Sequence, residues 1–309
     1  MKKPLFGLRE RELGLTLWVN RCLKSQTVDI GAWLGRYLLD GRKPPGKTTT
    51  EGINSMSNAV ALTEGQFNWI YNALSFGLIS MIACTVYTLV SQPRVLPKYR
   101  KALVLSSMVT FIAGYHYWRI FNSFHDASNQ FSITVRGANN AFNEAYRYVD
   151  WILTVPLLLV ETIAVLALAK EVAASLTTRL VIASALMIGL GYPGEIATEN
   201  NPKVLWGVLS TIPFIYILYV LFKELGASLE RQPAGVAATV GRLRLLLIGT
   251  WGVYPISYLF PLLGIEGTDA FVWRQTGYTI ADILAKCVFG LTIYKIARMK
   301  SAAEGMKEE

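Results

Sequence analysis

The feature that most constrains this chain is a series of seven long apolar stretches. They cover residues 66–90, 100–122, 143–168, 178–193, 203–225, 240–263 and 270–297. A helix of about 20 apolar residues crosses the hydrocarbon core of a lipid bilayer. The segments between the stretches are short, and the alternating strands of about ten residues that build a membrane barrel are absent. The sequence therefore predicts an all-α membrane protein, a seven-transmembrane-helix bundle over residues 53–309 in contact with the lipid bilayer.

The distribution of charge predicts how the bundle is oriented. The chain carries a net charge of +9, and its basic residues follow the first, third, fifth and seventh stretches. Examples are Arg94, Lys170, Arg231 and Arg298. Because short cytoplasmic loops are enriched in Lys and Arg, we expect a multi-pass protein with a cytoplasmic C-terminus and the main N-terminal end outside. The basic residues are spread along the chain without a nucleic-acid-binding motif, so we expect no nucleic acid as a partner.

Residues 1–52 form a separate basic N-terminal extension, with ten Lys or Arg against five Asp or Glu. Its apolar runs are too short to span a bilayer. An interfacial amphipathic helix and a targeting segment are both open interpretations. The chain's three cysteines, Cys22, Cys84 and Cys287, are scattered, and two of them lie in predicted spans. This spacing argues against a disulfide framework or a metal site.

Lys286 lies in the middle of the seventh stretch, with Asp282 one helical turn before it. An amine at that depth is costly to bury, so ionisable residues in a span indicate function. Buried lysines form Schiff bases with carbonyl compounds. The alternative is a structural lysine that is ion-paired or reaches toward the membrane surface.

The third stretch carries a second polar set, with Asp150, Thr154 and Glu161 on one helical face. The rise from Asp150 to Glu161 is about 16 Å, half the thickness of a bilayer. Two carboxyl groups at different depths with a hydroxyl between them are suited to relaying protons. The alternative is that Asp150 pairs with Arg147 and Glu161 caps a neighbouring helix. Arg147 and Lys286 together would neutralise Asp150 and Asp282 in the interior.

Several motifs resemble those of the microbial (type 1) rhodopsins. The segments that resemble this family are Asp282-x-x-x-Lys286, Arg147-Tyr-Val-Asp150-Trp-x-x-Thr154, Gly114-Tyr-His116-Tyr-Trp-Arg, Gly191-Tyr-Pro-Gly-Glu, Trp206-Gly207-Val-Leu-Ser and Trp251-Gly-Val-Tyr254-Pro. The resemblance covers about residues 64–300 and is most specific for the proton-pump group of xanthorhodopsin and Gloeobacter rhodopsin.

The resemblance implies a role for each ionisable residue. Lys286 carries all-trans retinal as a Schiff base, Asp150 is the counterion and proton acceptor, Asp282 is the second counterion, and Glu161 is the proton donor. The implied function is a light-driven outward proton pump, an ion transporter rather than an enzyme. Arg274 stands where bacteriorhodopsin suggests a glutamate, which leaves the proton release group open.

The resemblance also implies supporting residues. His116 hydrogen-bonds Asp150 in a counterion network that includes Arg147 and Thr154. Trp151, Trp251 and Tyr254 form the retinal pocket, although aromatic residues at these positions also suit simple core packing.

Gly207 has two interpretations as well. It corresponds to a glycine that leaves an opening for a hydroxylated carotenoid antenna, and a glycine in a membrane helix also serves close helix packing. A homo-oligomer, trimer or pentamer, is implied by resemblance alone. The competing functions are a photosensory rhodopsin, a light-driven pump for another ion, and a seven-helix transporter without retinal, which would leave Lys286 unexplained.

Overall fold

The computed structural model describes residues 59–135, 140–197, 199–230 and 232–306. The chain divides into two units, Met1–Gly52 and Ile53–Glu309. The N-terminal extension expected over residues 1–52 lies outside the described residues. Its interpretation as an interfacial helix or a targeting segment therefore stays a prediction.

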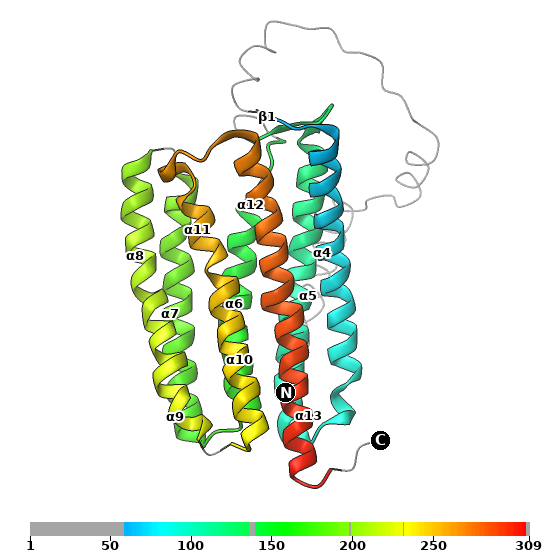
Figure 1. Cartoon of the computed structure of the whole chain (residues 1–309), viewed down its shortest axis with the longest axis vertical. Coiled ribbons are helices and arrows are strands. Elements are labelled where there is room, and N and C mark those ends of the chain that lie inside the picture. The colour runs from blue at the N-terminus through cyan, green and yellow to red at the C-terminus, as the bar shows by residue number, and fades with distance from the viewer. Residues whose placement is uncertain (1–58, 136–139, 198, 231, 307–309) are drawn as a thin grey trace, which may run out of the picture. The chain divides into compact units, whose positions relative to one another are not determined.

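Seven helical rods run roughly parallel or antiparallel through the described part of the second unit (Figure 1). The first four rods are α4 (Glu64–Val90), α5 (Pro97–Asp126), α6 (Tyr146–Leu166) and α7 (Lys170–Ile196). The fifth rod joins α8 (Asn200–Tyr219), the π-helical segment η3 (Val220–Glu224) and α9 (Leu225–Leu229). The sixth joins α10 (Ala234–Trp251) and α11 (Val253–Leu259), and the seventh joins α12 (Gly267–Asp282), the π-helical segment η5 (Ile283–Val288) and α13 (Phe289–Ala303). Two short 3-10 turns lie in the connections between rods: η2 (Gln92–Arg94) follows α4, and η4 (Pro261–Leu263) follows α11. The predicted fold class is confirmed, because each apolar stretch overlaps one rod.

The ends of the rods are set by polar residues that the apolar stretches do not mark. The fourth rod was expected over 178–193 and extends over Lys170–Ile196, because its first turn is exposed and polar and still helical. Thr63 precedes α4 and forms a capping box with Gln66. The backbone N–H of Gln66 donates to the Thr63 hydroxyl at 3.2 Å, and the backbone N–H of Thr63 donates to the side-chain oxygen of Gln66 at 3.0 Å.

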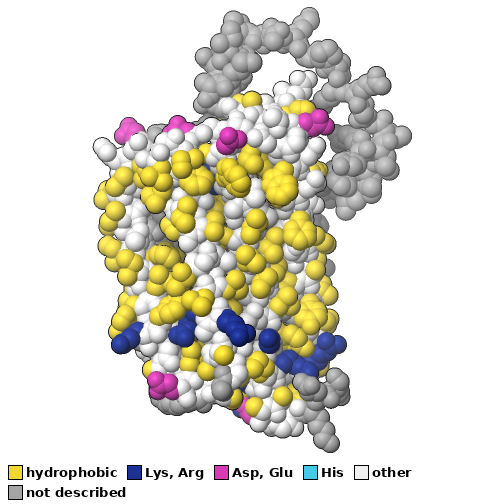
Figure 2. Space-filling model, viewed as in Figure 1, with side chains coloured by type: hydrophobic (Ala, Val, Ile, Leu, Met, Phe, Trp, Pro, Cys, Tyr) yellow, Lys and Arg dark blue, Asp and Glu magenta, His cyan; other side chains and the backbone are white. Residues whose placement is uncertain are grey.

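The surface of the bundle is that of a membrane protein. Apolar side chains cover the middle of the face in Figure 2, and Lys and Arg side chains form a band near the end where α13 finishes. By length and apolar character, α4, α6, α7, the fifth rod and the sixth rod can each cross a membrane. The second rod, α5, has a more polar sequence than these rods. Its polar residues include Ser106, Thr110 and His116, and these are buried inside the bundle rather than exposed on its surface.

A small antiparallel sheet closes the opposite end, and it was not predicted. Its order is β1 (Ala59–Ala61), β3 (Ser132–Thr134) and β2 (Ser128–Asn129), with Val60 opposite Ile133. The strands are too short for a periodic signal, and the turn between β2 and β3 uses two residues with positive φ, Gln130 and Phe131. The buried side chain of Ile133 attaches this sheet to the apolar interior.

Candidate functional site

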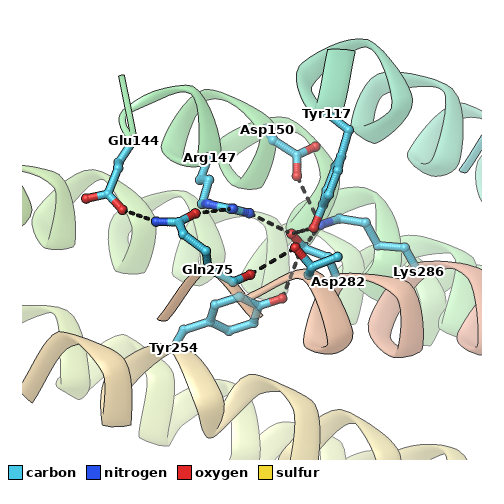
Figure 3. Close-up of polar contacts among 9 residues, drawn as sticks. Tyr117, Glu144, Arg147, Asp150, Tyr254, Gln275, Asp282 and Lys286 are labelled. Carbon is cyan, nitrogen blue, oxygen red and sulfur yellow. Dashed lines mark hydrogen bonds and ion pairs between the residues drawn. The ribbon is translucent and has the colours of Figure 1, made fainter. Parts of the chain in front are cut away.

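Lys286 lies in the centre of the bundle, where η5 replaces an ordinary turn of the seventh rod. Its side chain is 2% exposed. The amine lies 3.0 Å from Oδ2 of Asp150 on α6 and also contacts Oδ1 of Asp282 one turn earlier (Figure 3). All three residues are buried. A buried cation needs paired charges and hydrogen bonds, and here it has two carboxylates.

The two carboxylates have different surroundings. Asp282 accepts hydrogen bonds from Tyr117 at 2.9 Å and from Tyr254 at 2.8 Å, and Arg147 lies 3.5 Å away (Figure 3). Asp150 contacts Lys286 through Oδ2, while its Oδ1 is buried and has no hydrogen-bond partner in the part of the chain that the structure describes. Asp150 can therefore take a proton on Oδ1 without breaking a hydrogen bond, whereas both Asp282 oxygens are already engaged.

Arg147 extends the site toward the sheet end of the bundle. Its guanidinium donates to the Gln275 side chain at 2.8 Å, and Gln275 in turn donates to Glu144 (Figure 3). Arg274 pairs with the other oxygen of Glu144 at 2.9 Å. A continuous series of polar contacts thus leads from Lys286 to Glu144 and Arg274. Arg274, which stands where a glutamate was suggested, thus has an acidic partner, and the identity of the proton release group stays open.

Glu161 lies further along α6 than Asp150, toward the C-terminal end of that helix, and is separate from this network. Its side chain is 0% exposed, and among the described residues its carboxyl group faces the Ser106 hydroxyl and the Cys84 thiol and has no paired cation. Thr154 is buried between the two carboxyl groups along α6 and donates to the backbone carbonyl of Asp150 at 2.9 Å. The face expected from the spacing of Asp150, Thr154 and Glu161 is the buried face of α6.

The expected hydrogen bond between His116 and Asp150 is not formed among the described residues. Both side chains are buried, and each leaves one atom without a partner, Nδ1 of His116 and Oδ1 of Asp150. The His116 ring packs edge-on against Tyr115, with 5.3 Å between ring centres. Coupling of His116 to Asp150 therefore stays a prediction.

A cavity of about 390 Å³ lies beside the lysine. Its wall includes the expected aromatic residues Trp151, Trp251 and Tyr254, together with Tyr278, Gly207 and Lys286. The Trp151 ring centre lies 4.7 Å from that of Tyr254 and 5.7 Å from that of Tyr278. A largely apolar cavity of this size, with the buried Lys286 amine in its wall, fits a small, largely hydrocarbon ligand. Lys286 is the group that could bind such a ligand covalently.

Some site residues were missed by the sequence analysis. Gln275 lies seven residues before Asp282, which places both on one face of the seventh rod, and this spacing could have identified it. Tyr117 lies on the buried face of α5, where an aromatic residue also suits simple core packing, so its sequence position did not mark it as a site residue. Nothing in the sequence marked Glu144, which lies just before α6 and meets Arg274 from another rod.

The fold and the site together define a seven-helix membrane protein with a buried lysine between two aspartates. Residues 69–299 match the family described as bacteriorhodopsin-like protein. The chain belongs to this family and is a microbial (type 1) rhodopsin.

Relatives and solved structures agree with this assignment. The green-light absorbing proteorhodopsin of Gamma-proteobacterium EBAC31A08 is 32% identical over 237 residues, covering 75% of this chain and 88% of the relative. The bacteriorhodopsin of Halobacterium salinarum is 29% identical, covering 83% and 92%. The structure of xanthorhodopsin, described as a light-driven ion pump with dual chromophore, is 43% identical, with a TM-score of 0.74 and coverage of 81% and 99%. A thermophilic rhodopsin structure is also 43% identical, with a TM-score of 0.74 and coverage of 79% and 98%.

Proposed function

We propose that this chain is a light-driven outward proton pump that uses all-trans retinal attached to Lys286. The observation that carries the proposal is the Lys286 amine, held between Asp150 and Asp282 at the wall of an apolar cavity. The names of its relatives support the same class of function, since they include a green-light absorbing proteorhodopsin and a light-driven ion pump.

The cavity residues fit retinal. When bound, retinal supplies the absorption of light and a change of shape that reorients the proton on Lys286 Nζ. The rings of Trp151, Trp251 and Tyr254 restrict the space beside the lysine, and the mostly apolar wall keeps water away from the amine. Asp150 and Asp282 provide the negative charge that a protonated nitrogen requires at this depth.

The proton relay follows from the positions of the carboxyl groups. Asp150 receives the proton from Lys286 Nζ, because its Oδ2 lies 3.0 Å away and its Oδ1 has no other partner. Asp282 remains ionised because two tyrosine hydroxyls and Arg147 stabilise the carboxylate. Arg147, Gln275 and Glu144 form the polar route away from the site (Figure 3).

Glu161 is the proposed proton donor that restores the proton on Lys286 Nζ. Glu161 is buried and has no paired cation among the described residues, and a carboxyl group in such a site is most stable as the neutral acid. Its position about 16 Å along the helix from Asp150 separates donor from acceptor. Protons therefore enter at the Glu161 side and leave at the Asp150 side.

The outward direction rests on the band of basic side chains. They lie near the end of the bundle where α13 finishes (Figure 2), and the positive-inside rule makes that end cytoplasmic. Glu161 is then nearer the cytoplasm, and the Glu144–Arg274 pair is nearer the outer surface. The protein would work in the lipid bilayer as a homo-oligomer, trimer or pentamer.

A carotenoid antenna is the second part of the proposal. Gly207 lines the same cavity as Lys286, so the part of the cavity wall that α8 contributes has no side chain at this residue. A Cβ atom at this position would lie 3.0 Å from the ring of Tyr258, too close for an undisturbed fit. The related xanthorhodopsin is described as having a dual chromophore. A hydroxylated carotenoid bound beside Gly207 would lie next to the proposed retinal cavity and could transfer its excitation energy to retinal.

The test is to add all-trans retinal to the purified protein, record the visible spectrum, and measure pH changes in illuminated cells that make it. We expect a visible band, acidification of the medium, and loss of both in Lys286→Ala. Lys286→Ala leaves the buried Asp150 carboxylate without its ion pair, while Asp282 keeps Arg147 and two tyrosines, so Lys286→Ala/Asp150→Asn is the better-folded control. No visible band in the wild type would favour a transporter without retinal. A band with only slow spectral changes and no proton movement would favour a photosensor. Light-driven transport that depends on chloride or sodium would favour a pump for another ion.

A further inference from the structure

Lys300 is a buried cation at the basic end of the bundle. It lies in the last turn of α13, and its side chain is 7% exposed. Its amine donates a hydrogen bond of 2.6 Å to the backbone carbonyl of Leu166 and lies 5.1 Å from the centre of the Tyr99 ring. Among the described residues it forms no ion pair, so its charge is stabilised by a carbonyl dipole and an aromatic face.

The carbonyl that Lys300 contacts belongs to the helix that carries Glu161. Leu166 is the last residue of α6, and Ala167 ends the helix in the left-handed region at φ 49°. The last carbonyls of a helix lack donors from their own helix, and a lysine at this end also interacts favourably with the helix dipole. Glu161 is five residues earlier, about 7.5 Å along the axis. Lys300 therefore places a positive charge at the end of α6 nearest Glu161.

Three other polar side chains surround Lys300. Tyr99 on α5 donates to Glu304, which follows α13, and Lys98 pairs with the same carboxylate. The hydrogen bond from Lys98, followed by that from Tyr99, lowers the pKa of Glu304 below its usual range. Glu304 therefore stays ionised near neutral pH and is engaged by its own partners. The Lys300 charge also interacts with the Glu304 carboxylate, but the hydrogen bond to Leu166 places its amine at the end of the helix that carries Glu161.

We propose that Lys300 is a positioning residue for proton uptake, which closes the end of α6 and stabilises the ionised form of Glu161 after it has given up its proton. This inference rests on the proposed pump function. A positive charge favours a nearby carboxylate over the neutral acid. Because Lys300 lies beyond the Leu166 carbonyl, the two charges are roughly 10–15 Å apart, and at an effective dielectric constant of about 20 the effect on an equilibrium is roughly 6- to 16-fold. Lys300 thus favours donation toward Lys286, and refilling of Glu161 requires a proton to pass this cation.

The test compares four variants of the full retinal-bound protein in lipid vesicles. Lys300→Met removes the charge and the donor, and Lys300→Arg keeps both. Lys295→Met makes the same change at an exposed position of α13. Flash spectroscopy measures the rate at which the deprotonated pigment recovers, and infrared spectroscopy measures the carboxylic acid band of Glu161. We expect recovery in Lys300→Met to be 3- to 15-fold slower, with a shifted band, and near-normal values in Lys300→Arg and Lys295→Met.

The fourth variant, Lys300→Met/Glu161→Gln, separates a specific effect from a general one. If Lys300 acts through Glu161, the double variant recovers no more slowly than Glu161→Gln alone. Normal recovery and an unshifted band in Lys300→Met would overturn the inference, as would equal slowing with and without Glu161. Where Lys300→Met fails to fold, Lys300→Gln keeps a donor without the charge and is measured in its place. The pump proposal fails separately, if the wild-type protein moves no protons in light.

Discussion

Tyr254 donates a hydrogen bond of 2.8 Å to Oδ1 of Asp282, the oxygen that also contacts the Lys286 amine. Tyr254 lies on the sixth rod and Asp282 on the seventh, so this bond joins two helices at the level of the lysine. The Tyr254 ring also lines the cavity. One side chain therefore shapes the ligand space and fixes the orientation of a carboxylate.

Tyr254→Phe should lower the free energy of unfolding by about 1 kcal/mol, since one hydrogen bond to a buried carboxylate is lost while Tyr117 and Arg147 still contact it. Thermal denaturation of the purified protein measures the change, which corresponds to a fall of about 2–4 °C in Tm. Tyr219→Phe, at an exposed position of α8, is the matched control. An unchanged Tm in Tyr254→Phe would show that this bond adds nothing to stability.

Asp150→Asn should stop proton movement and shift the visible absorption to the red. The variant lacks the carboxylate that lies 3.0 Å from Lys286 Nζ, so it loses both the acceptor and a negative charge that stabilises the positive nitrogen. Absorption spectra and light-induced pH changes in vesicles check the two effects. Proton movement at the wild-type rate in Asp150→Asn would exclude this residue as the acceptor.

Glu161→Gln should leave the colour almost unchanged and slow the recovery of the deprotonated pigment by about 100-fold. The colour is preserved because Glu161 lies outside the network around Lys286 and contacts neither Asp150 nor Asp282. Flash spectroscopy at neutral pH measures the recovery. An unchanged recovery rate would rule out the donor role.

Gly207→Trp should abolish energy transfer from an added hydroxylated carotenoid and leave retinal absorption in place. Even a Cβ atom there crowds Tyr258, so an indole would fill the opening beside the cavity. The measurement is the action spectrum for pumping with and without carotenoid. Gly189→Trp, at an exposed position of α7 with open space around it, is the control. A carotenoid band that persists in Gly207→Trp, or that is absent from the wild type across several carotenoids, would contradict the antenna proposal.

The seven rods and the central residues could be predicted because both follow from periodicity. Apolar length marks a membrane span, and a spacing of four places Asp282 beside Lys286. The partners supplied by other helices could not be predicted in this way. Tyr117 reaches Asp282 from a helix 165 residues earlier in the chain, and Glu144 meets Gln275 across 131 residues. Such contacts depend on how the rods pack, which helical spacing does not encode.

The two π-helical segments were also not predicted. A single wide turn leaves the apolar pattern of its helix nearly intact, so neither η3 nor η5 has a signal in the sequence. The small sheet of β1, β3 and β2 was missed because its strands contain only two or three residues each. These features are local departures from regular structure, and they are stabilised by tertiary contacts.

The wide turn of η5 has a mechanical consequence for the proposed pump, in which a ligand would change shape on Lys286. A regular α-helix is stiff along its axis, whereas a π-helical turn carries an extra residue in its loop and has fewer optimal backbone hydrogen bonds. Lys286 is inside that turn. Displacement of the Lys286 side chain would therefore be taken up first by the peptide groups of this turn, before the regular helices on either side of it have to move.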